Sequence, residues 1–174
     1  MITYLRPLIF VIFSLTPYLI SQGNNFLQQR KIEQLLITRK CVGCNLAGVN
    51  LAGINLEKID LRSTDLQGAN LKNANLRYAN LEWTDLRSAN LQGADLTGAT
   101  LKNTLLVDTN FQGANLAASN WERAVFRNAN LSHANLEKAA KVNNIQDSHS
   151  VILCKTILPN GMTSDRCDKP TYKI

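Results

Sequence analysis

Large apolar residues recur at every fifth position over residues 46–136, and no position in the series is skipped. The residue directly before each of them is Asn or Asp, except at Thr100, Leu105 and Val125. The residue two positions before is small or β-branched, most often Ala or Thr. The nineteen members of this ladder are Leu46, Leu51, Leu56, Leu61, Leu66, Leu71, Leu76, Leu81, Leu86, Leu91, Leu96, Leu101, Leu106, Phe111, Leu116, Trp121, Phe126, Leu131 and Leu136.

A five-residue period matches neither the repeat of a helix nor the two-residue alternation of a straight strand. The chain must therefore bend once per repeat, with the ladder residue and the small residue two before it pointing inward. A single repeat cannot bury its own apolar residue, so the repeats have to stack on copies of themselves. The pattern predicts an all-β solenoid whose remaining positions face water.

The stretch GANLKNANLRYANLEWTDLRSANLQGADLTGA resembles the A(D/N)LXX signature of the pentapeptide-repeat family, and the resemblance extends over half of the chain. It implies a right-handed quadrilateral β-helix with four pentapeptides per coil. Nineteen pentapeptides would then make about five coils. The flanking segments TRKCVGCNLAGVNLAG and LCKTILPNGMTSDRC are similar to those of cyanobacterial members. Some members of that kind, with plant relatives, occupy the periplasm or the thylakoid lumen, so the similarity implies export. It implies no established activity.

Residues 1–23 combine Arg6 with an uncharged apolar run at residues 8–20 and small residues at Ser21 and Gly23. The run is short for a membrane span of about 20 residues and is typical of a signal peptide. We expect export with cleavage after Gly23. The alternative is an uncleaved membrane anchor formed by residues 5–20.

The rest of the chain divides into three further segments: a capping helix at residues 24–40, the β-helix at 41–140 and a hairpin-like tail at 141–174. The helix is expected over residues 26–39, with Asn24 or Asn25 as its N-cap. An open solenoid end exposes apolar side chains and unpaired strand edges, so a cover is needed there. A basic amphipathic membrane helix is the less favoured alternative.

Four cysteines lie outside the regular repeats, and in an exported protein an even number favours disulfides. The Asn-Gly pair between Cys154 and Cys167 is a hairpin turn signal, which would bring these two cysteines together. By elimination, Cys41 would pair with Cys44. The alternatives for the latter pair are a redox-active motif and half of a zinc site, although the second C-x-x-C that a zinc site normally needs is absent.

An apolar interruption of the polar positions is predicted near the C-terminal end of the column. Leu105 and Val125 stand one coil apart where Asn or Asp is the rule, and Val107 lies beside them. Such a patch is either a binding site for a partner or a surface that the protein's own tail covers. We expect the second, because the tail supplies Val142, Ile145, Val151, Ile152 and Leu153.

Charge and residue types exclude several functions. Residues 41–140 carry nine basic and nine acidic side chains, although the whole chain has a net charge of +6. A neutral column lacks the anionic field of the family members that mimic DNA and bind gyrase, and a basic excess confined to the flanks is weak evidence for nucleic-acid binding. His133 and His149 have no catalytic partner at a suggestive spacing.

We therefore predict a non-enzymatic scaffold with an unknown protein partner and no cofactor, metal or nucleic acid. A redox role through Cys41 and Cys44 is the alternative, and gyrase binding as a DNA mimic is a less favoured one.

Overall fold

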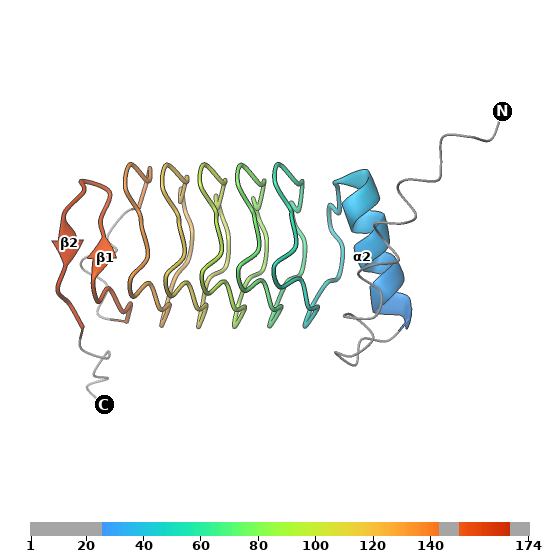
Figure 1. Ribbon diagram of the computed structural model, residues 1–174, viewed down its shortest axis with the longest axis horizontal. Coiled ribbons are helices and arrows are strands. Elements are labelled where there is room, and N and C mark those ends of the chain that lie inside the picture. The colour runs from blue at the N-terminus through green and yellow to red at the C-terminus, as the bar shows by residue number, and fades with distance from the viewer. Residues whose placement is uncertain (1–25, 143–149, 168–174) are drawn as a thin grey trace. The chain divides into compact units, whose positions relative to one another are not determined.

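The computed structural model describes residues 26–142 and 150–167 (Figure 1). The chain forms two compact units that divide between Thr38 and Arg39. The predicted signal peptide or anchor lies outside the described residues, as do Ile145 and His149. No helix within the described residues is long and apolar enough to cross a membrane.

The first unit contains helix α2, Phe26–Thr38, which ends one residue before its predicted end. The Thr38 hydroxyl donates a hydrogen bond to the Gln34 carbonyl oxygen at 2.8 Å. Arg39 follows with a φ of 55°, a left-handed conformation that is common directly after a helix. The capping role of this helix stays a prediction.

The second unit is a column of stacked coils (Figure 1). From Lys40 to Ala140, every parallel β-bridge joins residues twenty positions apart, so four pentapeptides separate each residue from its partner on the next coil. The bridging residues form four vertical rows, each of which we name by its first Asn or Asp; Lys40 precedes Asp60 in its row. These are the Asn45 face (Asn45, Asp65, Asp85, Leu105, Val125), the Asn50 face (Asn50, Asn70, Asn90, Asn110, Asn130), the Asn55 face (Asn55, Asn75, Asp95, Asn115, Asn135) and the Asp60 face (Asp60, Asn80, Thr100, Asn120, Ala140).

Backbone hydrogen bonds between coils hold this arrangement together. In a central repeat, the Leu91 N–H donates to the Asn110 carbonyl at 2.8 Å, and the Asn90 N–H donates to the Ala69 carbonyl at 2.9 Å. Within the repeat, the Ala94 N–H returns to the Leu91 carbonyl at 3.0 Å, which closes a tight turn. In most repeats, the bend predicted once per five residues is therefore a hydrogen-bonded β-turn, whereas residues 126–129 bend without this bond.

The third residue of each turn adopts a positive φ, as in Gly93 at 67° and Trp83 at 62°, which is the mark of a type II turn. The recurring glycines therefore have a conformational role and do not merely fill a variable outward position. Bulky residues at this corner, such as Tyr78 and Trp83, bear a steric cost that glycine avoids.

The core follows the predicted ladder closely. Eighteen of the nineteen ladder residues are buried, and Phe126, in the last coil, is only partly buried. Trp121 fits inside because its indole N–H donates to the Ser119 hydroxyl at 2.7 Å. Buried threonines are also satisfied: the Thr84 hydroxyl donates to the Leu61 carbonyl at 2.9 Å.

The tail adds two further turns to the column. Ile152 bridges to Asn130 and Ile157 to Asn135, and the side chains that follow them, Leu153 and Leu158, are buried. Strand β1, Thr156–Ile157, then pairs with β2, Thr163–Ser164, in an antiparallel hairpin. Since β2 pairs with β1, it covers part of the edge that β1 would otherwise expose.

Candidate functional site

The Asn or Asp before each ladder residue has one repeated task. In all sixteen repeats that carry it, its Oδ1 atom accepts a hydrogen bond from the backbone N–H two residues later, at 2.9–3.3 Å. Asn90, for example, accepts from the Gln92 N–H at 3.1 Å. This is an Asx turn, and it satisfies the one turn N–H that the next coil does not reach.

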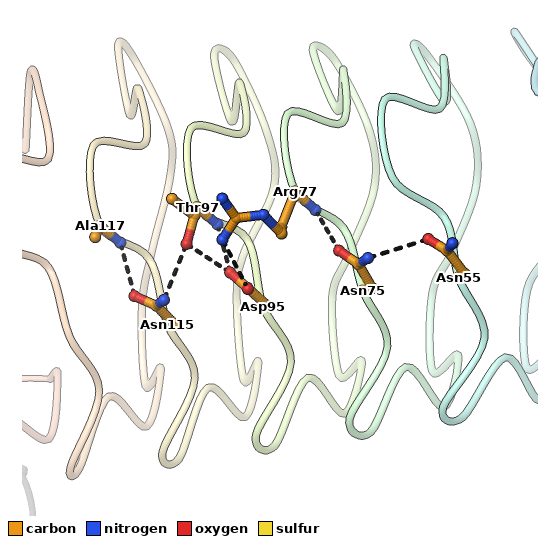
Figure 2. A network of polar contacts seen from close by, with 7 residues as sticks. All are labelled: Asn55, Asn75, Arg77, Asp95, Thr97, Asn115 and Ala117. Atoms are coloured by element: carbon orange, nitrogen blue, oxygen red, sulfur yellow. Dashed lines mark hydrogen bonds and ion pairs between the residues drawn. The ribbon is translucent and has the colours of Figure 1, made fainter.

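The Asn55 face carries a network of paired polar side chains (Figure 2). Asn75 donates to Asn55 at 3.1 Å, and Arg77 donates to Asp95 on the next coil at 3.1 Å. Thr97 donates to Asp95 at 2.6 Å and accepts from Asn115 at 2.9 Å. These polar groups satisfy one another, so this face offers few free groups to a ligand.

The same network sets the charge of Asp95. Burial raises the pKa of this carboxyl, but the hydrogen bonds from Thr97 and Arg77 outweigh burial and leave the pKa below its usual value. Asp95 is therefore ionised at neutral pH and paired with Arg77, which is what a structural network needs.

The Asn45 face is different in its C-terminal half. Leu105 and Val125 bridge to each other on adjacent coils, and they are 37% and 51% exposed. Val107, partly exposed, follows in the same turn. The structure thus brings together the three residues of the predicted apolar patch. We call these three residues the Leu105 patch.

Two backbone donors in this patch lack the usual acceptor. Because Leu105 and Val125 have no Oδ1 atom, the N–H groups of Val107 and Arg127 find no acceptor among the described residues. The Lys102 N–H, after Thr100, also has none within the described part of the chain, but it lies on another face without an exposed apolar neighbour. The Val42 N–H, after Lys40, also has no acceptor within the described residues, and Val42 is 45% exposed. The Leu105 patch differs because its two free donors lie on adjacent coils beside two exposed aliphatic side chains.

Both basic and acidic side chains lie near the patch. Arg87, one coil before Val107 in the stack, is tied to Asp85, and the hydrogen bond from Arg87 lowers the pKa of Asp85. The exposed Arg127 side chain has no ion pair within residues 26–142 and 150–167. The Asp108 carboxylate accepts from the Asn128 amide at 2.9 Å.

Three of the tail residues that were expected to cover the patch lie elsewhere. Val151 and Leu153 point into the column and are buried, since the segment that holds them continues the Asn50 face. Ile152 is the bridging residue of that added turn. Among the described tail residues, the predicted cover is therefore wrong for these three, while Ile145 lies outside the described residues.

Disulfides join Cys41 to Cys44 and Cys154 to Cys167. Cys41 stands five residues before Leu46 and so takes the ladder position of the first turn, while Cys44 takes the inward position. The second disulfide links Cys154, in the added turn after Ile152, to Cys167, three residues after the end of β2. Each disulfide thus belongs to one end of the regular repeats.

Other candidate residues form no site. His133 occupies a turn corner with a φ of 60°, and exposed Tyr78 and Trp83 occupy two more. The Tyr78 ring lies over Gly98, with the Arg77 guanidinium 5.5 Å from its centre. Within the described residues, no three His, Cys, Asp or Glu side chains are grouped as metal ligands would be.

The repeats match the family model for pentapeptide repeats in eight copies, over residues 40–77, 64–103 and 105–139. These segments make up more than half of the chain. The chain belongs to the pentapeptide repeat family. No curated protein sequence matches it significantly.

Solved structures of other pentapeptide repeat proteins are similar to this one. A protein from the Arabidopsis thaliana thylakoid lumen is 28% identical over 59% of this chain and 71% of its own, with a TM-score of 0.57. Rfr23 from the cyanobacterium Cyanothece 51142 is 32% identical over 64% and 86%, with a TM-score of 0.40. HetL from Nostoc, involved in heterocyst differentiation regulation, is 28% identical over 72% and 64%, with a TM-score of 0.34. As a pentapeptide repeat protein, this chain forms a right-handed β-helix.

Sequence reasoning found the Leu105 patch but missed the free donors beneath it. The signal was present, because each interruption of the Asn or Asp row removes an acceptor as well as a polar side chain. Cys41 in the ladder register could also have been read by counting back five residues from Leu46. The added turns of the tail carried no such signal, since neither Ile152 nor Ile157 matches the repeat.

Proposed function

We propose that this pentapeptide repeat protein is a non-enzymatic scaffold that docks another protein on the Leu105 patch. One observation carries the proposal: two exposed aliphatic side chains interrupt a column whose other bridging positions are almost all Asn or Asp. Burial of an exposed Leu or Val side chain against a partner is worth about 1.5–3 kcal/mol. The patch could therefore anchor a modest interface.

The choice of residue supports a role outside the fold. Leu105 and Val125 forgo the Asx hydrogen bond, which is worth about 1 kcal/mol, and their side chains do not enter the core. Asn at these positions would fit the column, because Asn45 occupies the same row and accepts from the Ala47 N–H at 3.1 Å. The stability lost here is consistent with selection for binding.

Photo-crosslinking from position 107 tests the docking proposal. A benzophenone amino acid at Val107 would report contacts of the patch, and the same group at Gln112, in the equivalent turn position of the Asn50 face, is the matched control. We expect a defined adduct in the native cells from position 107 only. Equal adducts from both positions, or none from 107, would refute the proposal.

We also propose that the protein is exported, with residues 1–23 as a cleaved signal peptide. If this segment is not cleaved, residues 5–20 form a membrane anchor. Two disulfides suit an oxidising compartment, and a structural relative comes from the thylakoid lumen. Cell fractionation with thiol alkylation tests the location: we expect a lumenal or periplasmic protein with no alkylated cysteine. A cytosolic protein with four alkylated cysteines would contradict export.

For the finer architecture, we propose about five coils at residues 41–140, the helix at residues 24–40 as their cap and the tail at residues 141–174 as the opposite cover. Bulky Val49 and Ile59 at inward positions near the start of the column support a covered N-terminal end. Deletion of residues 24–40 should cause self-association through the open end, measured by light scattering. A deletion variant that stays monomeric would argue against the cap.

A redox role for Cys41 and Cys44 is a second candidate, favoured by the C-x-x-C spacing and by partial exposure of both residues. Against it, the pair occupies core positions of a β-turn and not a helix N-terminus, which would activate the thiol. Its reduction potential decides: a strongly reducing value excludes exchange. Gyrase binding as a DNA mimic stays less favoured because the column is neutral, and inhibition in a supercoiling assay would reverse that judgement.

A further inference from the structure

The Asp-x-Arg sequence recurs on this column as a closed clamp. Asp85 Oδ1 accepts the backbone N–H of Arg87 at 3.1 Å and its Nε at 2.9 Å, while Oδ2 accepts Nη2 at 2.5 Å. Asp60 and Arg62 repeat this geometry, with 3.3, 2.9 and 2.8 Å for the same three bonds. In each clamp, one carboxylate takes the backbone and side-chain donors of one arginine.

Arg127 is the arginine half of such a clamp without its carboxylate. It follows Val125 as Arg87 follows Asp85, on the same face and at the same place in the repeat. Within the described residues, neither its backbone N–H nor its guanidinium has an acceptor. One coil earlier in the stack, the Val107 N–H is a second unpaired donor, and coils are about 4.8 Å apart.

From these donors we infer that the Leu105 patch binds an acidic–apolar peptide segment of a partner protein. The partner's carboxylate accepts from the Arg127 N–H and guanidinium, and its adjacent apolar side chain packs on Leu105 and Val125. This inference rests on the proposed docking function and adds the chemistry of the partner. Carboxylate is favoured over a neutral acceptor because charge-assisted bonds to arginine are the stronger ones.

The charge around the patch agrees with this assignment. Arg87 and Lys102 are already paired, with Asp85 and Glu122. Asp108 forms no ion pair among the described residues, and its carboxylate accepts a hydrogen bond from the Asn128 amide at 2.9 Å. Arg127 is therefore the cation of this face that has no acidic partner among the described residues.

Binding of two short blocked peptides tests the inference: acetyl-Ser-Leu-Asp-Leu-Asp-Ser-amide and its counterpart with Asn in place of both Asp residues. Amide chemical shifts from ¹⁵N-labelled protein give both the affinity and the site. We expect the acidic peptide to bind about tenfold more tightly, with the Val107 and Arg127 amide signals moving most. Equal affinities, or shifts confined to other faces, would overturn the inference.

Val125→Asp supplies the missing carboxylate from the column itself, as Asp85 does two positions earlier in the same row. It should fold, because Asp65 and Asp85 occupy the same row, and it should abolish the preference for the acidic peptide. Thr100→Asn is the matched control, since it restores an acceptor on the Asp60 face and should leave peptide binding unchanged. Undiminished preference in Val125→Asp would refute the clamp.

Hydrogen exchange of the protein without peptide tests whether a segment of the same chain already occupies the patch. Fast exchange of the Val107 and Arg127 amides is expected if the donors are free. Slow exchange would mean that residues 143–149 of the same chain cover them, which would overturn the inference. If position 107 crosslinks to a partner but the acidic and neutral peptides bind equally well, only the acidic–apolar inference is refuted. If the peptides bind but no crosslink forms in the native cells, the docking function is refuted.

Discussion

Replacement of Leu91 by Ala tests the inward ladder at the centre of the column. The Leu91 side chain is fully buried, and the ladder residues of the coils on either side, Leu71 and Phe111, are fully buried as well. The backbone bonds of Leu91, to the Asn110 carbonyl and from the Ala94 N–H, do not involve the side chain. The substitution therefore removes apolar volume and leaves the turn intact.

The expected loss follows from the removed atoms and the cavity that they leave. Three carbon atoms at about 0.8 kcal/mol each give about 2.4 kcal/mol of lost transfer free energy. The flanking coils are held by hydrogen bonds at 2.7–3.0 Å, so they cannot collapse into the space. With the cavity term, we expect the free energy of unfolding to fall by about 3–5 kcal/mol.

Urea unfolding provides the measurement, followed by far-UV circular dichroism and by tryptophan fluorescence, in which buried Trp121 should give the larger change and exposed Trp83 the smaller one. Two probes are needed because repeat proteins can unfold in parts. Gln67→Ala, at an exposed turn position, is the control and should change the free energy by less than about 0.5 kcal/mol. A loss below about 1 kcal/mol for Leu91→Ala would refute the inward assignment.

Three further tests probe other features. Gly98→Ala and Gly113→Ala should each lower the free energy of unfolding by about 1 kcal/mol, because both positions have a positive φ. In urea unfolding, Gly98→Ala should cost more, because its Cβ would lie 2.6 Å from the Tyr78 ring, while Gly113 has open space; equal losses would contradict the ring contact. The arginine hydrogen bond that lowers the pKa of Asp85 stabilises the fold above the unfolded pKa of about 3.9, so unfolding midpoints should fall as the pH drops below that value and less so in Asp85→Asn. Serine in place of Cys154 and Cys167 should cost about 3 kcal/mol from the closed loop, measured as a lower unfolding midpoint, and an unchanged midpoint would argue against the disulfide.

The column could be predicted because the sequence pattern that specifies it repeats at a fixed period. Each ladder residue is spaced by five from the next, and one inward residue per repeat leaves a single way to bury them all. The tail broke this rule: Leu153 follows Leu136 by seventeen residues, so no count of five leads to it. Its burial depends on the hairpin and on bridges to Asn130 and Asn135, which are tertiary contacts that no local pattern encodes.

The candidate site divides in the same way. Leu105 and Val125 were visible as breaks in the Asn and Asp row, and their exposure follows from their place in the repeat. The free N–H of Arg127 was not visible, because the function of the row as a hydrogen-bond acceptor emerges only from the turn geometry. Once that geometry is known, the sequence Val-x-Arg can be recognised as an Asp-x-Arg clamp that lacks its carboxylate.

The most direct test of the docking function is the yield of the crosslink from position 107 in native cells, compared between the otherwise natural chain and a Leu105→Asn, Val125→Asn variant. Asn at both positions restores the Asx acceptors and removes the exposed aliphatic surface, so the fold should be at least as stable. We predict that the adduct is lost while the melting temperature is unchanged or higher. An adduct of full yield in the variant would contradict a docking role for this patch.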